Sequence, residues 1–155
     1  MVARSSNVTV HAVRWRVLDG VTAEGLLLVP KRIRAHVVAI PDADWTPEMF
    51  CGMQPDLPPE SQLARRLAEQ GCLVVVPTLI SRNDELSGHP DIGFTNLTHR
   101  EFIYRQAFEM GRHVIGYEVQ KVLAAVDLFE QLSKNSVKSR EQERLPIGVC
   151  GVAEG

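Results

Sequence analysis

Hydrophobic and polar residues alternate from Val8 to Leu18, which predicts a half-buried β-strand. The alternation changes phase near Ala12-Val13, so a β-bulge is expected at that point. Asp19-Gly20 is a turn signal, and the apolar stretch Thr22–Val29 that follows it ends at Pro30. The chain is therefore expected to begin with an antiparallel hairpin.

Two nearly uniform apolar runs follow the hairpin, at Ala35–Ile40 and Cys72–Val76. Runs without alternation are typical of strands that are buried on both faces of a parallel sheet. A helix is predicted between them from Pro59 to Gln70, because prolines stand at its start and Gly71 occupies the position after its C-cap. This order of elements predicts a right-handed βαβ unit with parallel strands.

Helical spacing returns in the second half of the chain. Thr98-x-x-Glu101 has the sequence of a capping box, so a helix is expected to begin at His99 and to break near Gly111. A second helix is predicted beyond Arg112, and its sheet-facing positions are expected to be Ile115, Val119, Val122, Leu123, Val126, Phe129 and Leu132. The last strand is predicted at Leu145–Cys150.

These elements add up to an α/β fold, with a mostly parallel sheet flanked by helices and an antiparallel hairpin at its start. The length of 155 residues suits one domain, and 45% hydrophobic and 23% charged residues are ordinary for a globular protein. A net charge of -2 gives no electrostatic footprint for nucleic acid or an anionic membrane. The apolar runs are also too short to cross a bilayer. We therefore expect no nucleic-acid partner and no membrane partner.

Cysteine usage indicates the compartment. Cys51, Cys72 and Cys150 are odd in number and form no CxxC pair, which favours free thiols in a reducing environment. Met1–Val10 lacks the apolar core of a signal peptide. A cytoplasmic location is therefore expected.

The strongest candidate chemistry follows the last strand. Ile147–Cys150 runs into the stretch Gly151-Val152-Ala153-Glu154-Gly155, whose glycines have the spacing of a nucleophile elbow. This strand-turn-helix element holds a hydrolase nucleophile in a strained backbone position. Here the nucleophile position is Ala153, and a methyl group cannot attack a carbonyl. Glu154 is then either a base near the site or a solvated turn residue.

The order of elements and the elbow resemble the α/β-hydrolase superfamily. More narrowly, they resemble its dienelactone hydrolase and acetyl xylan esterase-like branch. The likeness is carried by Val37–Asp44, by Met110–His113 with Ala124–Asp127, and by Ile147–Gly155. It implies a small-molecule ester or acyl substrate. We expect no cofactor and no metal. The likeness also implies an oxyanion loop made of Asp42, Ala43 and Asp44.

Two departures from the family pattern bear on activity. One is Ala153 at the elbow, and the other is the acidic pair Asp42 and Asp44, which would repel an oxyanion although backbone N–H groups are the donors that matter. In the resembling family, the triad acid and histidine follow the elbow. Residues 1–155 are therefore expected to form a single, incomplete domain that ends at the elbow. Such an esterase-like fragment would not be competent alone. The alternative is a non-catalytic binding or structural module.

Other assignments stay open at this stage. Cys150 could be the nucleophile, although the second glycine of its frame, Gly148–Val152, arrives one residue early. The glycines of the last strand and turn could also bind a dinucleotide, but such a fingerprint normally lies at the first βα turn. His89, Asp91 and His99 are metal-capable residues without the spacing of a metal site, in or beside a polar stretch expected to lie at the surface.

The resembling fold places the elbow strand near the centre of its sheet. A chain that ended at the elbow would leave this strand as an open apolar edge, and such edges template association. We therefore expect self-association through an exposed sheet edge.

Overall fold

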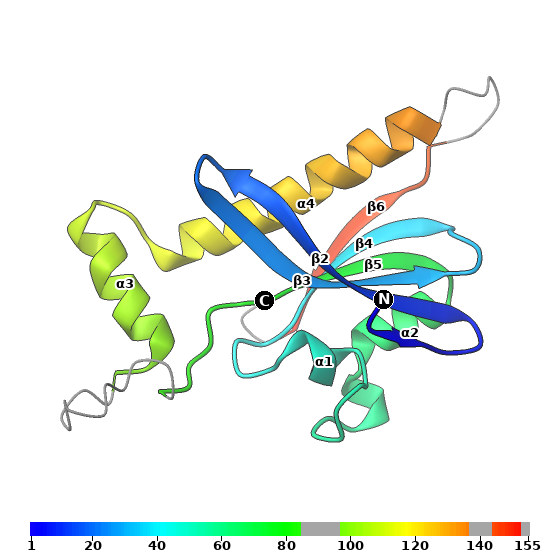
Figure 1. Ribbon diagram of the computed structural model, residues 1–155, viewed down its shortest axis with the longest axis horizontal. Coiled ribbons are helices and arrows are strands. Elements are labelled where there is room, and N and C mark those ends of the chain that lie inside the picture. The colour runs from blue at the N-terminus through cyan, green and yellow to red at the C-terminus, as the bar shows by residue number, and fades with distance from the viewer. Residues whose placement is uncertain (85–96, 137–143, 153–155) are drawn as a thin grey trace.

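A computed structural model describes residues 1–84, 97–136 and 144–152, which form a mixed sheet with helices on both faces (Figure 1). The six strands lie in the order β1-β2-β3-β5-β4-β6. Their bounds are β1 Ala3–Arg4, β2 Val8–Leu18, β3 Val21–Pro30, β4 Ala35–Ile40, β5 Cys72–Pro77 and β6 Ile147–Gly151. The helices are α1 Pro47–Phe50, the 3-10 helix η1 Pro59–Ser61, α2 Leu63–Glu69, α3 His99–Glu109 and α4 Val114–Ser136.

The predicted hairpin is confirmed, but the predicted bulge is in the wrong place. β2 pairs with β3 in an unbroken register from Val8 to Arg16, and the irregularity lies between Arg16 and Leu18. The backbone is therefore regular at Ala12-Val13, and the phase change in the sequence needs a different cause.

That cause is a change in which face of β2 is covered. Val8 and Val10 pack in the core on the α1 and α2 side of the sheet. Val13 and Trp15 point to the opposite face, into the core beneath α4. Each half of the strand is therefore buried on a different face. In the sequence, this looks like a one-residue shift in the alternation of apolar and polar residues, although the strand pairing is regular.

The βαβ unit is confirmed. β4 pairs in parallel with β5 on one side and with β6 on the other. The predicted helix at Pro59–Gln70 is divided into η1 and the shorter α2, and Gly71 follows it with a φ of 95°. The long loop before it contains α1, which begins with a capping box between Thr46 and Met49.

Two apolar cores lie on the two faces of the sheet. The first joins β2, β3, β4 and β5 to α1 and α2, and Phe50, Ala39 and Val74 lie at its fully buried centre. The second lies beneath α4, where Phe129 and Ala125 cover Val38 and Trp15. β4 is covered on both faces by these cores, which explains its uniform apolar sequence.

The predicted start of α3 and the predicted break between α3 and α4 are both confirmed. Thr98 accepts a hydrogen bond from the Glu101 N–H at the start of α3, and Gly111 separates α3 from α4 with a φ of 70°. The reciprocal half of the box, in which the Glu101 carboxylate would accept the Thr98 N–H, does not form, and this carboxylate accepts from Arg105 at 2.7 Å instead.

The predicted sheet-facing side of α4 needs a correction. Ile115, Val119, Leu123 and Leu132 are each about half exposed, at 48–54%. The fully buried residues of α4 are Val114, Ala125 and Phe129. The apolar surface of α4 is therefore wider than the strip that touches the sheet. In the described part of the chain, no helix combines the length and hydrophobicity needed to span a bilayer.

Candidate functional site

The topology defines one edge of the sheet as the candidate site. The chain leaves β4 for β5 on one side and later returns to β6 on the other side. β4 is therefore a topological switch point, and in parallel α/β sheets ligands bind outside the carboxyl ends of the strands at such a point. The segments that lie there are residues 41–44 after β4, residues 78–84 after β5 and Val152 after β6. The Val152 N–H donates to the Ile40 carbonyl at 3.2 Å.

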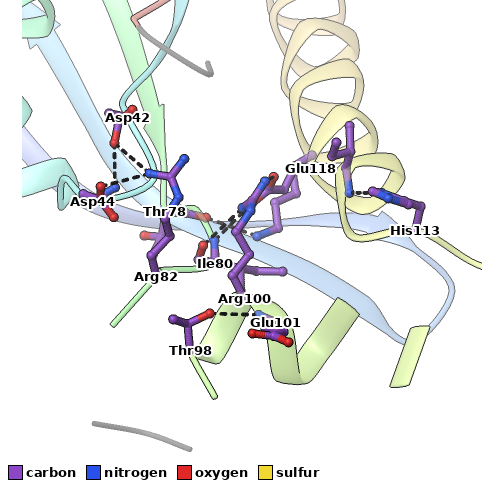
Figure 2. Close-up of polar contacts among 12 residues, drawn as sticks. Asp42, Asp44, Thr78, Ile80, Arg82, Thr98, Arg100, Glu101, His113 and Glu118 are labelled. Carbon is purple, nitrogen blue, oxygen red and sulfur yellow. Dashed lines mark hydrogen bonds and ion pairs between the residues drawn. The ribbon is translucent and has the colours of Figure 1, made fainter. Parts of the chain in front are cut away.

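An arginine holds the acidic loop at this edge (Figure 2). Arg82 Nη1 lies 3.3 Å from Asp42 Oδ1 and 2.9 Å from Asp44 Oδ2. The Asp42 carboxylate also accepts the Asp44 N–H at 2.9 Å, which closes the loop on itself. Asp42 is nearly buried and Asp44 is more than half exposed, so solvent weakens the outer pair far more than the inner one.

A second ion pair fixes the segment that carries Arg82. Arg100 of α3 and Glu118 of α4 form a bidentate pair with both N···O distances at 2.8 Å. The same two side chains bind the backbone of Ile80, since Glu118 Oε1 accepts its N–H at 3.1 Å and Arg100 donates to its carbonyl at 3.2 Å. Figure 2 shows this cluster beside the Asp42–Arg82–Asp44 group. The segment after β5 is thus tied to both helices.

Lys121 adds a further contact to the same segment. Its Nζ donates to the Thr78 carbonyl at 3.1 Å. Burial lowers the pKa of Lys121, and the neighbouring carboxylates Glu118 and Glu24 act in the opposite direction. The start of the β5 loop is therefore fixed by a partly buried cation as well as by the ion pair.

The predicted oxyanion loop lies at the switch point, whereas the elbow residues can be followed only in part. Ala43 is buried between its two acidic neighbours. β6 ends at Gly151, and Val152 packs against the core on the α1 and α2 side. Ala153 and Glu154 lie outside the described residues.

Cys150 belongs to β6, in register with Ala39 of β4, and packs against the same core. Burial raises the pKa of the Cys150 thiol, and Cys72 raises it further. The thiolate is the reactive form of cysteine, so this environment disfavours nucleophilic attack. The position of Cys150 supports a structural role.

The other chemistry raised by the sequence has little support at this edge. His89 and Asp91 lie outside the described residues. Within the ranges that the structure describes, no group of three or more His, Cys, Asp or Glu residues could hold a metal ion. Gly148 and Gly151 belong to β6 itself, so they stand in a strand rather than in a phosphate-binding turn.

The sequence interpretation did not identify Arg82, Arg100, Glu118 or Lys121. A signal for Arg82 existed, because two carboxylates directly after a buried strand need a nearby cation. The residues that could supply it are those in the loops after the neighbouring parallel strands. The Arg100–Glu118 pair joins separate helices, and no local spacing in the sequence could have indicated it.

Comparisons with known proteins bear on the class of fold. The sequence matches no protein-family model and no curated protein. Its structure is similar to that of a putative acetyl xylan esterase from Bacteroides fragilis NCTC 9343, with a TM-score of 0.64 and 15% identity over 98% of this chain and 40% of that chain. It is also similar to a dienelactone hydrolase-like promiscuous phosphotriesterase from metagenomic libraries, with a TM-score of 0.51 and 14% identity over 97% of this chain and 51% of that chain.

These likenesses confirm the α/β-hydrolase-like fold that the sequence resemblance predicted. One of these proteins is named an acetyl xylan esterase and the other a dienelactone hydrolase-like enzyme, and these are the two names of the branch that the sequence resembles. At 14–15% identity the likeness establishes the fold, and the chain spans 40% and 51% of the two solved chains. Catalytic activity therefore has to be argued from the site itself.

Proposed function

We propose that this chain is an α/β-hydrolase-like module of the esterase or dienelactone hydrolase type that does not hydrolyse esters in its present form. Ala153 carries the proposal, because it stands at the nucleophile position of the elbow pattern in the sequence Gly151–Gly155. Covalent acyl transfer requires a group such as a hydroxyl, thiol or carboxylate at that position. An alanine side chain supplies none of these.

The acidic loop supports the same proposal. An oxyanion hole needs donors aimed at the developing negative charge. Asp42 and Asp44 place carboxylates in the loop assigned to that role, and Asp42 uses its own carboxylate to engage the Asp44 N–H. That N–H is consequently occupied within the loop. Arg82 offsets the acidic charge but binds both carboxylates through one nitrogen.

The proposed ligand is a small-molecule ester or acyl compound, bound at the carboxyl edge of β4 and β6 without a cofactor. The free thiols at Cys51, Cys72 and Cys150 support a reducing compartment, so we place the protein in the cytoplasm.

The test is hydrolysis of p-nitrophenyl acetate by the purified chain, compared with the Ala153→Ser variant. We expect the unmodified chain to release p-nitrophenol no faster than buffer. A stoichiometric burst from Ala153→Ser alone would show that the rest of the elbow and oxyanion loop remains competent. Turnover by the unmodified chain would overturn the proposal, and Cys150→Ala would then show whether that thiol is responsible.

The alternative is a binding or structural module with no residual chemistry. The Asp42–Arg82–Asp44 group favours it, because the charges at the edge are already paired with each other. Absence of a burst from Ala153→Ser would support this alternative. Fluorescence titration with a short-chain ester would then separate its two forms. Trp45 follows the acidic loop and its backbone N–H donates to the Asp42 carbonyl, so saturable quenching is expected if ligand binds there.

A further inference from the structure

A small cavity opens at the amino ends of β4 and β5, at the opposite end of these strands from the candidate site. It lies between the β3–β4 turn, residues 31–34, and the end of α2, residues 68–71, and its volume is about 260 Å³. The Arg34 N–H joins the two segments by donating to the Gly71 carbonyl at 2.9 Å. Since β4 and β5 have six residues each, the cavity lies about 20 Å from the carboxyl edge. Its lining residues all lie within residues 7–71, so β6 takes no part in it.

Three cationic side chains line this cavity, and their charges are not neutralised by the surrounding protein. They are those of Lys31, Arg32 and Arg34. Among residues 1–84, 97–136 and 144–152, none forms a hydrogen bond or an ion pair with any of these three side chains. The carboxylate in the lining, that of Glu69, already pairs with Arg65 at 2.9 Å. The lining therefore has an excess of two positive charges.

The end of α2 does not need these cations as helix caps. Carbonyl groups at a helix C-terminus often bind basic side chains. Here the Gly71 N–H donates to the Ala68 carbonyl at 3.0 Å. The Gln70 N–H is shared between the Arg66 and Leu67 carbonyls, at 3.2 and 3.1 Å. Because the backbone satisfies these carbonyls, the three cationic side chains stay available to a ligand.

Close packing at Gly71 holds the turn and the stem of Arg34 in place. A Cβ on Gly71 would lie 3.1 Å from the Arg32 carbonyl oxygen and 3.2 Å from Arg34 Cδ, which is closer than ordinary van der Waals contact. The φ of 95° at Gly71 also favours glycine. A guanidinium group whose stem is already packed loses less conformational entropy when it binds a ligand.

We propose that this cavity binds the phosphate group of a small, soluble phosphate monoester. Such a group carries about −1.5 to −2 charges at neutral pH, which matches the excess positive charge of the lining. Guanidinium groups bind phosphate oxygens through parallel N–H donors. The cavity is smaller than the range of about 300–1,000 Å³ that is typical of ligand pockets, so the ligand must be small. Ala68 and Pro30 are buried in its wall and provide apolar contact for a short carbon chain.

The experiment is calorimetric titration of the full 155-residue chain with glycerol 3-phosphate, with inorganic phosphate and glycerol as comparison probes. We expect saturable binding of glycerol 3-phosphate at one site, weaker binding of inorganic phosphate and no binding of glycerol. Binding should persist at an ionic strength of about 0.15 M, because direct contacts are much shorter than the Debye length of about 8 Å. The melting temperature should also rise with the concentration of glycerol 3-phosphate, since the ligand binds the folded chain.

The matched variants are Arg34→Gln and Arg105→Gln. Each removes one exposed arginine charge, but Arg105 belongs to α3 and is not part of the lining. We expect Arg34→Gln to weaken the binding of glycerol 3-phosphate by about tenfold or more, and Arg105→Gln to leave it unchanged. Arg34→Lys should show an intermediate loss, because it keeps the charge without the parallel donors. Glu69→Gln should tighten binding, because it removes the negative charge from the lining.

Circular dichroism checks that each variant is folded, and Arg32→Gln repeats the test at the second guanidinium group. Three results would overturn the proposal: no saturable binding by the parent chain, the same affinity in the parent and in both Arg34→Gln and Arg32→Gln, or equal weakening by Arg34→Gln and Arg105→Gln. The last would mean that the anion responds only to the net charge of the protein.

Discussion

At the scale of single residues, His36 couples the sheet to α4. Its ring stacks on Phe129 with centroids 4.9 Å apart, and its Nδ1 lies 3.5 Å from Ser133 Oγ. The residue is only 5% exposed. Burial lowers the pKa of His36 below its ordinary value of 6.5, because the cationic form loses solvation there.

This shift predicts a loss of stability in mild acid. The unfolded chain takes up a proton at His36 as the pH falls through 6.5, whereas the folded chain resists protonation until a lower pH. The free energy of unfolding should therefore decrease below pH 6.5 and level off below the folded-state pKa. Urea titrations across this range measure it. His36→Phe should flatten this part of the profile, and an unchanged slope in that variant would assign the effect to other groups.

Cys51 should be the least reactive thiol of the protein. Burial, helped by Glu48, raises the pKa of Cys51 to about 12. The thiolate needed for alkylation is then scarce at neutral pH. Mass spectrometry after brief iodoacetamide treatment should find Cys51 unmodified in the folded protein and modified in denaturant. Rapid native labelling of Cys51 would show that the core around Phe50 opens readily.

Gly25 is required by the close approach of β3 and β5. A Cβ at this position would clash with the Val76 carbonyl oxygen, which is part of the backbone. Gly25→Ala is expected to destabilise the fold by about 1–3 kcal/mol, the usual range for overpacking. Gly116→Ala is the control, because nothing lies within 4 Å of the new methyl group on α4. The control should gain about 0.5–1 kcal/mol from helix propensity. Thermal melts of both variants would distinguish these outcomes.

At the scale of elements, the Arg100–Glu118 pair links α3, α4 and the β5 loop. The two side chains are 19% and 12% exposed. Removing either one takes the ion pair from the other and one of the two side-chain hydrogen bonds from the Ile80 backbone. Glu118→Gln is expected to cost on the order of 2 kcal/mol, typical for a hydrogen bond to a charged group. The exposed pair Arg105–Glu101 provides the comparison, and Glu101→Gln should cost less than about 0.5 kcal/mol. Equal losses in chemical denaturation would contradict a special role for the inner pair.

The two sides of α4 should respond differently to substitution. Phe129→Ala removes a ring from the core beneath α4 and is expected to cost about 3–5 kcal/mol. Leu123→Gln changes an exposed position and should stay within about 0.5 kcal/mol of the parent protein. Denaturation midpoints test both values. A large loss for Leu123→Gln would mean that this side of the helix is covered in solution.

At the scale of the whole molecule, strands were easier to predict than helix faces. β4 and β5 are uniformly apolar because helices cover both of their faces, and this pattern survives in the sequence without ambiguity. The four residues of α1 are too few to show a helical period, so the segment looked like loop. On α4, apolar residues encircle more of the helix than the sheet covers. The spacing of apolar residues alone therefore could not show that Phe129 is buried and Leu123 is half exposed.

The candidate site was predictable at its acidic loop and not at its cations. Asp42 and Asp44 follow a recognisable buried strand, so their place at the carboxyl edge follows from the topology. Arg82 is 40 residues from Asp42 and 38 from Asp44 in the sequence, and Arg100 meets Glu118 only after α3 and α4 have packed. Contacts of this kind depend on the tertiary fold. The fold could therefore be predicted from the sequence, whereas the ion pairs of the site could not.

The distribution of the tryptophans has a consequence for spectroscopy. The chain contains two, and each belongs to a different face of the sheet. Trp15 packs beneath α4 and donates from its indole nitrogen to the Lys121 carbonyl at 3.1 Å, whereas Trp45 packs with Phe50 on the opposite face. In Trp45→Phe, the remaining emission would follow the docking of α4. In Trp15→Phe, it would follow the closure of the α1 and α2 layer. Stopped-flow refolding of the two variants would therefore show whether the layers assemble together or in turn.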